Sequence, residues 1–198
     1  MKLYSFNALV SRMKYIARWG LMRSSRTETL CEHTADTAIV AHTLASVAKN
    51  VFGMEVSPEK IAVAALYHDA PEILTGDMPT PVKYKNNALK NEYKALENEA
   101  ANALCRLVPE EIKDDMQSYL LQTNLTPEEK KLLKAADRIS ALIKCIEEEQ
   151  SGNREFVRAK EQQLTALVGM NSEVVQYFIE HMLPCYEYNL DELTHGDF

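Results

Sequence analysis

A histidine and an aspartate stand next to each other at His68 and Asp69, shortly before Pro71. Imidazole and carboxylate groups are both good ligands for a divalent transition metal. The pair ends a predicted apolar helix and lies where that helix opens into a segment rich in turn residues. Such a dipeptide is weak evidence by itself, so a metal site here requires further ligands elsewhere in the chain.

Asp137 and His33 are the candidates for those further ligands. Asp137 lies in mid-helix beside apolar residues, where an unpaired carboxylate is costly unless a metal, a cation or a hydrogen-bond donor compensates it. A salt bridge to Arg138, to a lysine or to an arginine of another helix explains Asp137 equally well. His33 begins a predicted helix, where a histidine is more often a surface or capping residue. As a metal ligand, its ring could be oriented by Glu32.

The elements that position these residues are predicted to be helices, because apolar residues recur with helical spacing nearly throughout the chain. We therefore predict an all-α fold, a single-domain helical bundle over residues 1–198. A first helix is predicted from an apolar stripe at Phe6, Leu9, Val10, Met13 and Ala17. Further helices are predicted at about residues 31–52, 87–107, 109–121, 154–168 and 172–183, with two more that begin at Pro58 and Pro127 and end near Pro71 and Gly152.

Two of these helix starts are strongly marked in the sequence. Ser57 and Thr126 each place a capping hydroxyl before a proline, and Glu129 completes a capping box with Thr126. For the helix that follows His33, the expected inward face is Ala35, Ala38, Ile39, His42, Ala45 and Val51. For the helix that carries Asp137, the expected apolar face is Leu132, Leu133, Ala136, Ile139, Leu142, Ile143 and Ile146.

The formal net charge of −7 argues against a protein that binds nucleic acid polymers. Residues 1–26 nevertheless contain no acidic residue, and their basic residues are Lys2, Arg12, Lys14, Arg18, Arg23 and Arg26. This segment could supply a positive field for a small anion, or form a solvated face or a transit peptide. The longest apolar run, Ile61 to Tyr67, is far shorter than the roughly 20 residues that span a bilayer. The scattered cysteines fit a cytoplasmic protein.

The order His33, then His68 with Asp69, then Asp137 resembles the H…HD…D pattern of the HD-domain phosphohydrolase superfamily. The chain is similar in particular to the bacterial HD-domain 5′-deoxynucleotidases, through the strings RWGLMRSSRTETLCEHTADTA, LYHDAPEILTGDMPTPVKY and LLKAADRISALIKCIEE. The similarity covers essentially the whole chain, which implies one HD phosphohydrolase domain. Gly20 and Met78 depart from the family pattern, which often has proline and leucine at these positions.

The resemblance implies that His33, His68, Asp69 and Asp137 hold one divalent cation, with Co²⁺ or Mn²⁺ favoured over other divalent transition metals. It also implies that Arg18 holds the phosphate, a role that suits a guanidinium because it can contact two oxygens at once. The further substrate contacts implied are His33, Asp69 and Asp137 again, together with Trp19, Asp77, Met78, Pro79 and Thr80. Without the resemblance, Trp19 is equally well explained as a core residue.

Glu72 follows His68 by four positions and shares its helix face if the helix continues past Pro71. The resemblance implies that Glu72 orients or deprotonates the attacking water, whereas the sequence alone favours an exposed glutamate at a helix end. The implied reaction is hydrolysis of a 2′-deoxyribonucleoside 5′-monophosphate to deoxynucleoside and phosphate. In related enzymes the tryptophan and the loop at 77–80 leave no room for a 2′-hydroxyl.

Other HD enzymes hydrolyse deoxynucleoside triphosphates, (p)ppGpp or cyclic nucleotides, and these remain alternatives. Only His42, His181 and His195 remain beyond the proposed ligands, so a dinuclear site is poorly supplied. A non-catalytic HD scaffold is an alternative of a different class. The family implies a homodimer, and the segment Ser172–Tyr188 could supply apolar surface for it or belong to the core.

Overall fold

The computed structural model describes residues 1–83 and 85–195, except for the side chains of Thr80 and Pro81. The regular elements of this described part are all helical, which confirms the predicted all-α fold. None of its helices combines the length and the apolar character that crossing a bilayer requires. The α-helices are α1 (Phe6–Val10), α2 (Leu30–Asn50), α3 (Pro58–Tyr67), α4 (Glu72–Thr75), α5 (Thr80–Lys83), α6 (Asn87–Cys105), α7 (Lys113–Leu120), α8 (Pro127–Gln150), α9 (Val157–Val168), α10 (Glu173–His181) and α11 (Leu190–His195). Short 3-10 turns lie at Ser11–Tyr15, Glu110–Ile112, Arg154–Phe156 and Leu183–Glu187.

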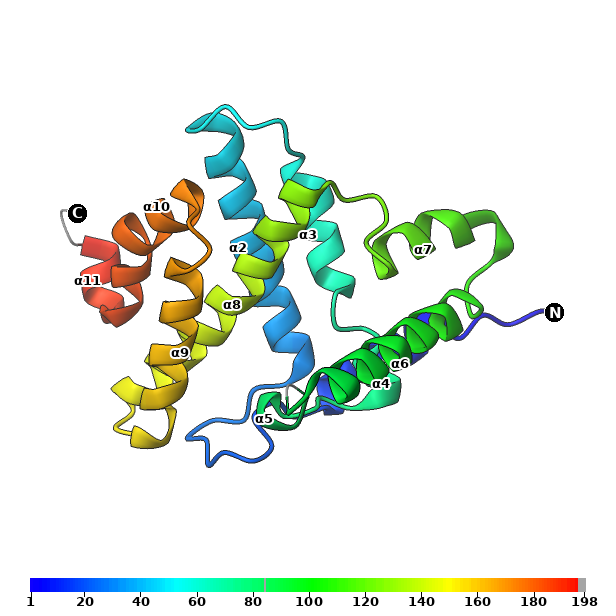
Figure 1. Cartoon of the computed structure of the whole chain (residues 1–198), viewed down its shortest axis with the longest axis horizontal. Helices are drawn as coiled ribbons and strands as arrows, with labels where there is room; N and C mark the ends of the chain where they lie inside the picture. Colours follow the sequence, from blue (N-terminus) through cyan, green and yellow to red (C-terminus); the bar gives the residue numbers. More distant parts are fainter. Residues whose placement is uncertain (84, 196–198) are drawn as a thin grey trace.

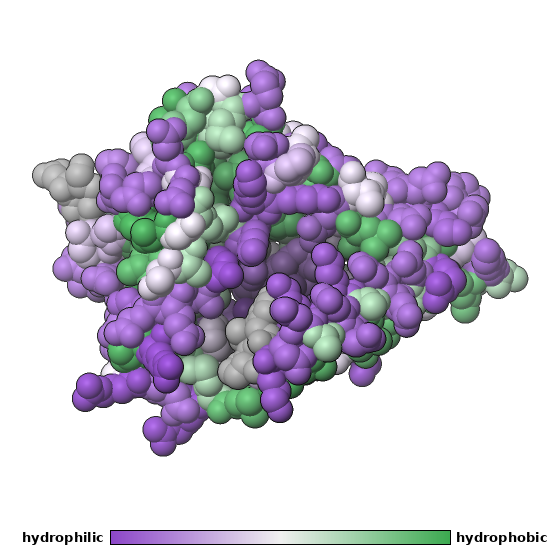
Figure 2. Space-filling view, viewed as in Figure 1, coloured by the Kyte–Doolittle hydropathy of each residue, from purple (hydrophilic) through white to green (hydrophobic). Residues whose placement is uncertain are grey.

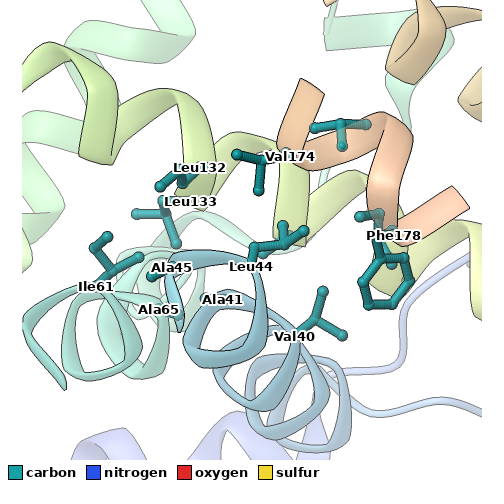
Figure 3. Close-up of a cluster of buried hydrophobic side chains, with 14 of the residues drawn as sticks. Val40, Ala41, Leu44, Ala45, Ile61, Ala65, Leu132, Leu133, Val174 and Phe178 are labelled. Carbon is teal, nitrogen blue, oxygen red and sulfur yellow. The ribbon is translucent and has the colours of Figure 1, made fainter. Parts of the chain in front are cut away.

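Helices α2, α3 and α8 pack together at the centre, with α9 against α8 and α10 against α2 (Figure 1). Their apolar side chains form the main core, which includes Leu44, Ile61, Leu133 and Phe178 (Figure 3). Burying one such side chain contributes roughly 1.5–3 kcal/mol. The core therefore holds the three helices that carry His33, the His68–Asp69 pair and Asp137 in a fixed arrangement.

The predicted apolar face of α8 is confirmed, because all of its members are buried. The predicted face of α2 is largely wrong, since Ile39 is 67% exposed and Val51 54% exposed. Helix α2 is covered on two sides, by α3 and by α8, so its buried face is wide and includes Thr34 and Thr37. Hydrophobicity alone gives no reason to place threonines inward and an isoleucine outward.

The helix starts at Ser57 and Thr126 are confirmed, including the capping box formed by Thr126 and Glu129. The first helix is shorter than predicted, because α1 gives way to a 3-10 turn. Ala17 lies beyond that turn, where its backbone pairs with Thr29 in an isolated antiparallel bridge. This bridge closes residues 17–29 into a loop that lies against the start of α2.

A second, smaller apolar cluster supports the chain around the His68–Asp69 pair. In it, Phe6 and Met13 pack with Leu30, Ala70 and Leu104. Leu30 begins α2 and Ala70 directly follows Asp69, so this cluster joins the N-terminal turn to both ligand-bearing segments. It also places α6 beside the candidate site.

Candidate active site

The candidate metal ligands come together from three helices that are distant in the sequence. His33 lies in the first turn of α2, His68 and Asp69 follow the end of α3, and Asp137 lies in the middle of α8. The Nε2 atom of His33 is 3.5 Å from Asp69 Oδ2 and 3.2 Å from Asp137 Oδ1. The Nε2 atom of His68 is 3.1 Å from Asp69 Oδ2 and 3.9 Å from Asp137 Oδ1. All four predicted ligands therefore lie together, in a group that we call the ligand cluster.

This cluster fits a divalent cation. Ligand atoms of His33, His68 and Asp69 all lie within 4.8 Å of one another, and two imidazoles with carboxylates suit a transition metal. His68 Nε2 is buried and makes no hydrogen bond to the described residues. Burial by itself would lower the pKa of His68, but the charge of Asp69 raises that pKa to about 9. The carboxylates thus favour a positive charge at this point, which a metal ion would supply in place of a proton.

The far side of each imidazole is fixed by a hydrogen bond. His33 Nδ1 is 3.0 Å from the hydroxyl of Ser140, and His68 Nδ1 donates to the carbonyl of Ala65 at 2.6 Å. Both bonds leave Nε2 free to face the carboxylates, as metal-bound histidines require. The expectation that Glu32 orients His33 is wrong, because the Glu32 carboxylate instead accepts from the backbone N–H and the hydroxyl of Thr29 at the cap of α2.

Glu72 is only 6% exposed, so its interpretation as an exposed helix-end residue is wrong. It begins the separate helix α4, and α3 does not continue past Pro71 as the shared-face argument required. Its Oε2 atom is buried without a hydrogen-bond partner among the described residues. Burial, with the charges of Asp69 and Asp77, raises the pKa of Glu72 to about 9. Once ionised, this carboxylate is therefore a strong base beside the ligand cluster.

Arg18 reaches the cluster from the N-terminal loop. Its Nη1 atom is 3.5 Å from Asp69 Oδ2, and its Nε donates to Glu28 Oε2 at 3.0 Å. Burial opposes the charged form of Arg18, but the charges of Asp69 and Glu28 raise its pKa. The other basic residues with described partners in the segment turn elsewhere: Lys2 to Tyr4, Arg12 and Lys14 to Tyr15, Arg23 to Glu155, and Arg26 to Glu32. The positive field at the site thus comes from Arg18 alone among them.

Trp19 is held in place by Glu28, a residue that the sequence did not indicate. The indole Nε1 donates to Glu28 Oε2 at 2.8 Å, so one carboxylate oxygen accepts from both Arg18 and Trp19. The other side of Trp19 meets the ring of Phe156 edge-on at 5.2 Å. Trp19 has a φ of 60°, a strained backbone for an aromatic residue that persists only when its surroundings hold it. No local pattern identifies Glu28, because its contacts depend on the backbone bridge between Ala17 and Thr29.

The predicted substrate loop, residues 77–80, lies near the ligand cluster but has fewer described contacts with it than Arg18 has. Burial raises the pKa of Asp77 against the opposing charge of Arg18, and Asp69 adds to the increase. Asp77 is therefore close enough to both groups to interact with them electrostatically. Met78 and Pro79 are half-buried, and Thr80 begins α5, although its side chain lies outside the described residues.

A cavity of about 540 Å³ opens from the ligand cluster towards α6 and the start of α8. Its inner wall includes His68, Asp69, Glu72 and Asp137. Figure 2 shows this face of the molecule hollowed near its centre, with hydrophilic residues around the opening. The volume is within the usual range of roughly 300–1,000 Å³ for small-molecule sites.

The chain is similar to several known proteins. A family described as 5′-deoxynucleotidase YfbR-like matches residues 5–186. The proteins named 5′-deoxynucleotidase YfbR from Shigella dysenteriae and from Escherichia coli are each 44% identical over 194 residues, covering 98% of this chain and 98% of theirs. An HD-domain phosphohydrolase from Listeria innocua has a TM-score of 0.81 at 24% identity, with 92% of this chain and 88% of that chain covered. A cyanophage S-2L HD phosphohydrolase, DatZ, solved with dA and one catalytic Zn²⁺ ion, has a TM-score of 0.61 at 21% identity, covering 89% of this chain and 95% of that chain.

Proposed function

Because the chain belongs to the family of YfbR-like 5′-deoxynucleotidases, we propose that it hydrolyses 2′-deoxyribonucleoside 5′-monophosphates to deoxynucleosides and phosphate. The observation that carries this proposal is the convergence of His33, His68, Asp69 and Asp137, of which the last three line the inner wall of a small-molecule cavity. A chain of net charge −7 with the largely buried Arg18 at this site suits a small anion better than a nucleic acid polymer.

The four clustered residues would hold one divalent cation, and we propose Mn²⁺ or Co²⁺ because the ligands mix nitrogen and oxygen. When bound, such a cation polarises the phosphoryl group and lowers the pKa of a bound water. The remaining steps depend on the residues of the chain itself. Arg18 would hold two phosphate oxygens, with its guanidinium already oriented by Glu28.

Glu72 would act as the general base. Its unpartnered Oε2 can accept the proton of the attacking water while the new O–P bond forms and the bond from phosphorus to the 5′-oxygen breaks. The leaving 5′-oxygen takes up a proton from solvent and departs as the deoxynucleoside hydroxyl, and Glu72 returns the proton of the attacking water to solvent. Because burial and the neighbouring acids raise the pKa of Glu72, this carboxyl must first lose its own proton before it accepts that of the water.

Selection of the sugar would depend on Trp19 and on Asp77, Met78, Pro79 and Thr80. Trp19 is fixed by Glu28 and Phe156 rather than free to move, so a rigid indole against the sugar would exclude a 2′-hydroxyl. Asp77, with its raised pKa, could donate or accept a hydrogen bond at the sugar.

Phosphate release from paired deoxy- and ribonucleoside monophosphates tests the proposal, using metal-stripped protein with and without Mn²⁺ or Co²⁺. Metal-dependent release from the deoxy series, with much less from the ribo series, is the expected result. Equal release from both series would contradict the assignment of Trp19. No release from either would contradict the monophosphatase assignment as a whole.

We also propose that the protein acts as a cytoplasmic homodimer. Val174, Val175 and Phe178 of α10 are buried in the core of their own chain, so they are not available for a dimer contact. Beyond them, Leu190 and Leu193 of α11 are 75% and 44% exposed and offer an apolar surface. Light scattering on wild-type protein and on a Leu190→Ser/Leu193→Ser variant tests whether this surface joins two chains.

A further inference from the structure

The cavity beside the ligand cluster has an outer half that the hydrolysis of a monophosphate does not require. Its inner wall is formed by candidate metal ligands and Glu72, but its outer wall is formed by Lys83 at the end of α5, by α6, by the end of α7 and by the start of α8. Arg18 does not line this cavity and contacts Asp69 from outside it. A phosphate at the ligand cluster would therefore have Arg18 on one side and the outer half of the cavity on another.

The outer wall carries an excess of positive charge. Lys94 of α6 and Lys130 and Lys134 of α8 line it, and none of these lysines has an ion pair with a described residue. The fourth lysine of the wall, Lys83, lies 2.7 Å from Glu97 and neutralises that acid. Three uncompensated cations thus face one hollow in a protein whose net charge is negative.

The spacing on α8 directs these charges towards the candidate metal site. Lys130, Lys134 and Asp137 follow one another at intervals of four and three residues, so they share one face of the helix. Like charges four residues apart destabilise a helix unless an anion lies between them. Lys131, on a different face of α8, does not line the cavity and pairs with Glu128 at 4.0 Å.

We propose that this lysine-lined half of the cavity binds the second and third phosphate groups of nucleoside 5′-di- and triphosphates. The inference rests on the proposed function, because it takes the position of the first phosphate, at the ligand cluster, from that function. Phosphate groups suit the site because their negative charges match three mobile ammonium groups. Such nucleotides therefore compete with the monophosphate substrate, and their affinity increases with the number of phosphates.

Inhibition constants of methylene-bridged deoxynucleoside di- and triphosphates test the proposal, measured against monophosphate hydrolysis at constant free metal. Lys130 and Lys134 are both exposed. The Lys130→Gln/Lys134→Gln variant should weaken inhibition by the triphosphate analogue roughly 5- to 30-fold, since each exposed charge pair contributes about 0.5–1 kcal/mol. Its kcat/KM for the monophosphate should stay within about threefold of wild type, because neither lysine contacts the ligand cluster. The matched control is Lys131→Gln, which should change neither quantity.

Three outcomes would overturn the inference. The first is equal inhibition by the diphosphate and triphosphate analogues. The second is an equal loss of inhibition in the double variant and in the Lys131→Gln control. The third is that inorganic pyrophosphate inhibits as strongly as the triphosphate analogue does. Calorimetric binding of the triphosphate analogue to metal-loaded protein repeats the comparison without turnover. Failure of monophosphate hydrolysis in the wild type would contradict the proposed function, whereas lysine-dependent binding in the calorimeter would still support the subsite.

Discussion

Two buried glutamates, Glu148 and Glu72, show how the same burial can produce opposite chemistry. Glu148 lies near the end of α8 and accepts hydrogen bonds from the backbone of Ser25 at 2.7 Å, from Asn153 at 2.8 Å, and from Lys144. Glu72 lies beside the ligand cluster with one carboxylate oxygen lacking any described partner. Both side chains are almost fully withdrawn from solvent.

The pKa values of the two glutamates follow this difference. Burial alone would raise the pKa of Glu148, but its hydrogen bonds with Lys144, Ser25 and Asn153 lower that pKa to about 2. Burial together with two nearby acids raises the pKa of Glu72 to about 9. A fully satisfied carboxylate stabilises the loop it holds, whereas an unsatisfied one costs stability and is available for proton transfer. The two glutamates therefore differ in whether their buried carboxylates have hydrogen-bond partners, and this difference predicts a structural role for Glu148 and a catalytic one for Glu72.

Replacing Glu72 is expected to have the largest effect on activity and to leave the fold intact. Glu72→Gln should lower kcat by a factor on the order of 10²–10⁴, because it removes the proposed general base. The melting temperature of the metal-free variant should equal or exceed that of the wild type at pH 8. The reason is that the fold raises the pKa of Glu72, so its contribution to stability falls as pH rises from about 4.5 towards 9. Thermal melts and initial rates of Glu72→Gln and of the exposed control Glu128→Gln check both parts. A large loss of stability in Glu72→Gln would contradict the comparison.

Replacing Glu148 should have the opposite profile. Glu148→Ala leaves Lys144, which is 3% exposed, without its carboxylate and should reduce the free energy of unfolding by about 3–5 kcal/mol. For a chain of this size that corresponds to a melting temperature lower by about 10 °C. The kcat of the folded variant at low temperature should stay close to wild type. Denaturant titration gives the first quantity, and a variant as stable as wild type would show that the network is not structural.

Glu28 shares features with both glutamates. Like Glu148 it is buried, at 5% exposed, and accepts hydrogen bonds, and like Glu72 it lies at the candidate site, where it orients two proposed substrate contacts, Arg18 and Trp19. Glu28→Gln should reduce kcat/KM for deoxynucleoside monophosphates about 10- to 100-fold, as for other residues that orient a site. It should also lower the ratio of kcat/KM for deoxy substrates to kcat/KM for ribo substrates, because a neutral amide holds Arg18 and Trp19 less firmly than the carboxylate does. Steady-state kinetics on both series measure this ratio, with Glu155→Gln as the control on a neighbouring exposed ion pair. If the ratio of deoxy to ribo activity did not change, Glu28 would contribute only to the stability of the fold.

The smallest effect concerns the acid stability of the metal-free protein. Because the fold lowers the pKa of Glu148, its contribution is fully present above about pH 4.5 and is lost as pH falls towards about 2. The wild type should therefore lose its stability advantage over Glu148→Gln across that interval. Unfolding free energies at pH 6, 4 and 3 measure the difference, and a gap that stays constant with pH would contradict the assigned shift.

The sequence predicts the parts of this protein that depend on local chemistry. Capping residues at Ser57 and Thr126 mark helix starts correctly, and the regular apolar face of α8 is buried as expected. The convergence of His33, His68, Asp69 and Asp137 is predicted by the resemblance of their order to the HD pattern, because each residue alone has an ordinary structural explanation. The prediction of a buried Ile39 fails because two-sided packing, rather than hydrophobicity, decides which face of α2 is covered.

Other features depend on contacts between segments that are far apart in sequence. Ser140, not the adjacent Glu32, lies against His33, and it is 107 residues away. Glu28 orients Arg18 and Trp19 only because the loop is closed by a backbone bridge. The sequence likewise does not single out Lys94, Lys130 and Lys134. They matter because they line the cavity without forming ion pairs to described residues, which only the structure shows.

Calorimetric titration of Mn²⁺ into metal-stripped protein tests the central claim most directly, in wild type and in Asp69→Asn. The account predicts one ion bound per chain in the wild type, with proton release because the pKa of His68 is raised to about 9, and binding lost or at least about tenfold weaker in the variant. Absence of binding in the wild type, or equal binding in Asp69→Asn, would contradict the claim that His33, His68, Asp69 and Asp137 form the metal centre.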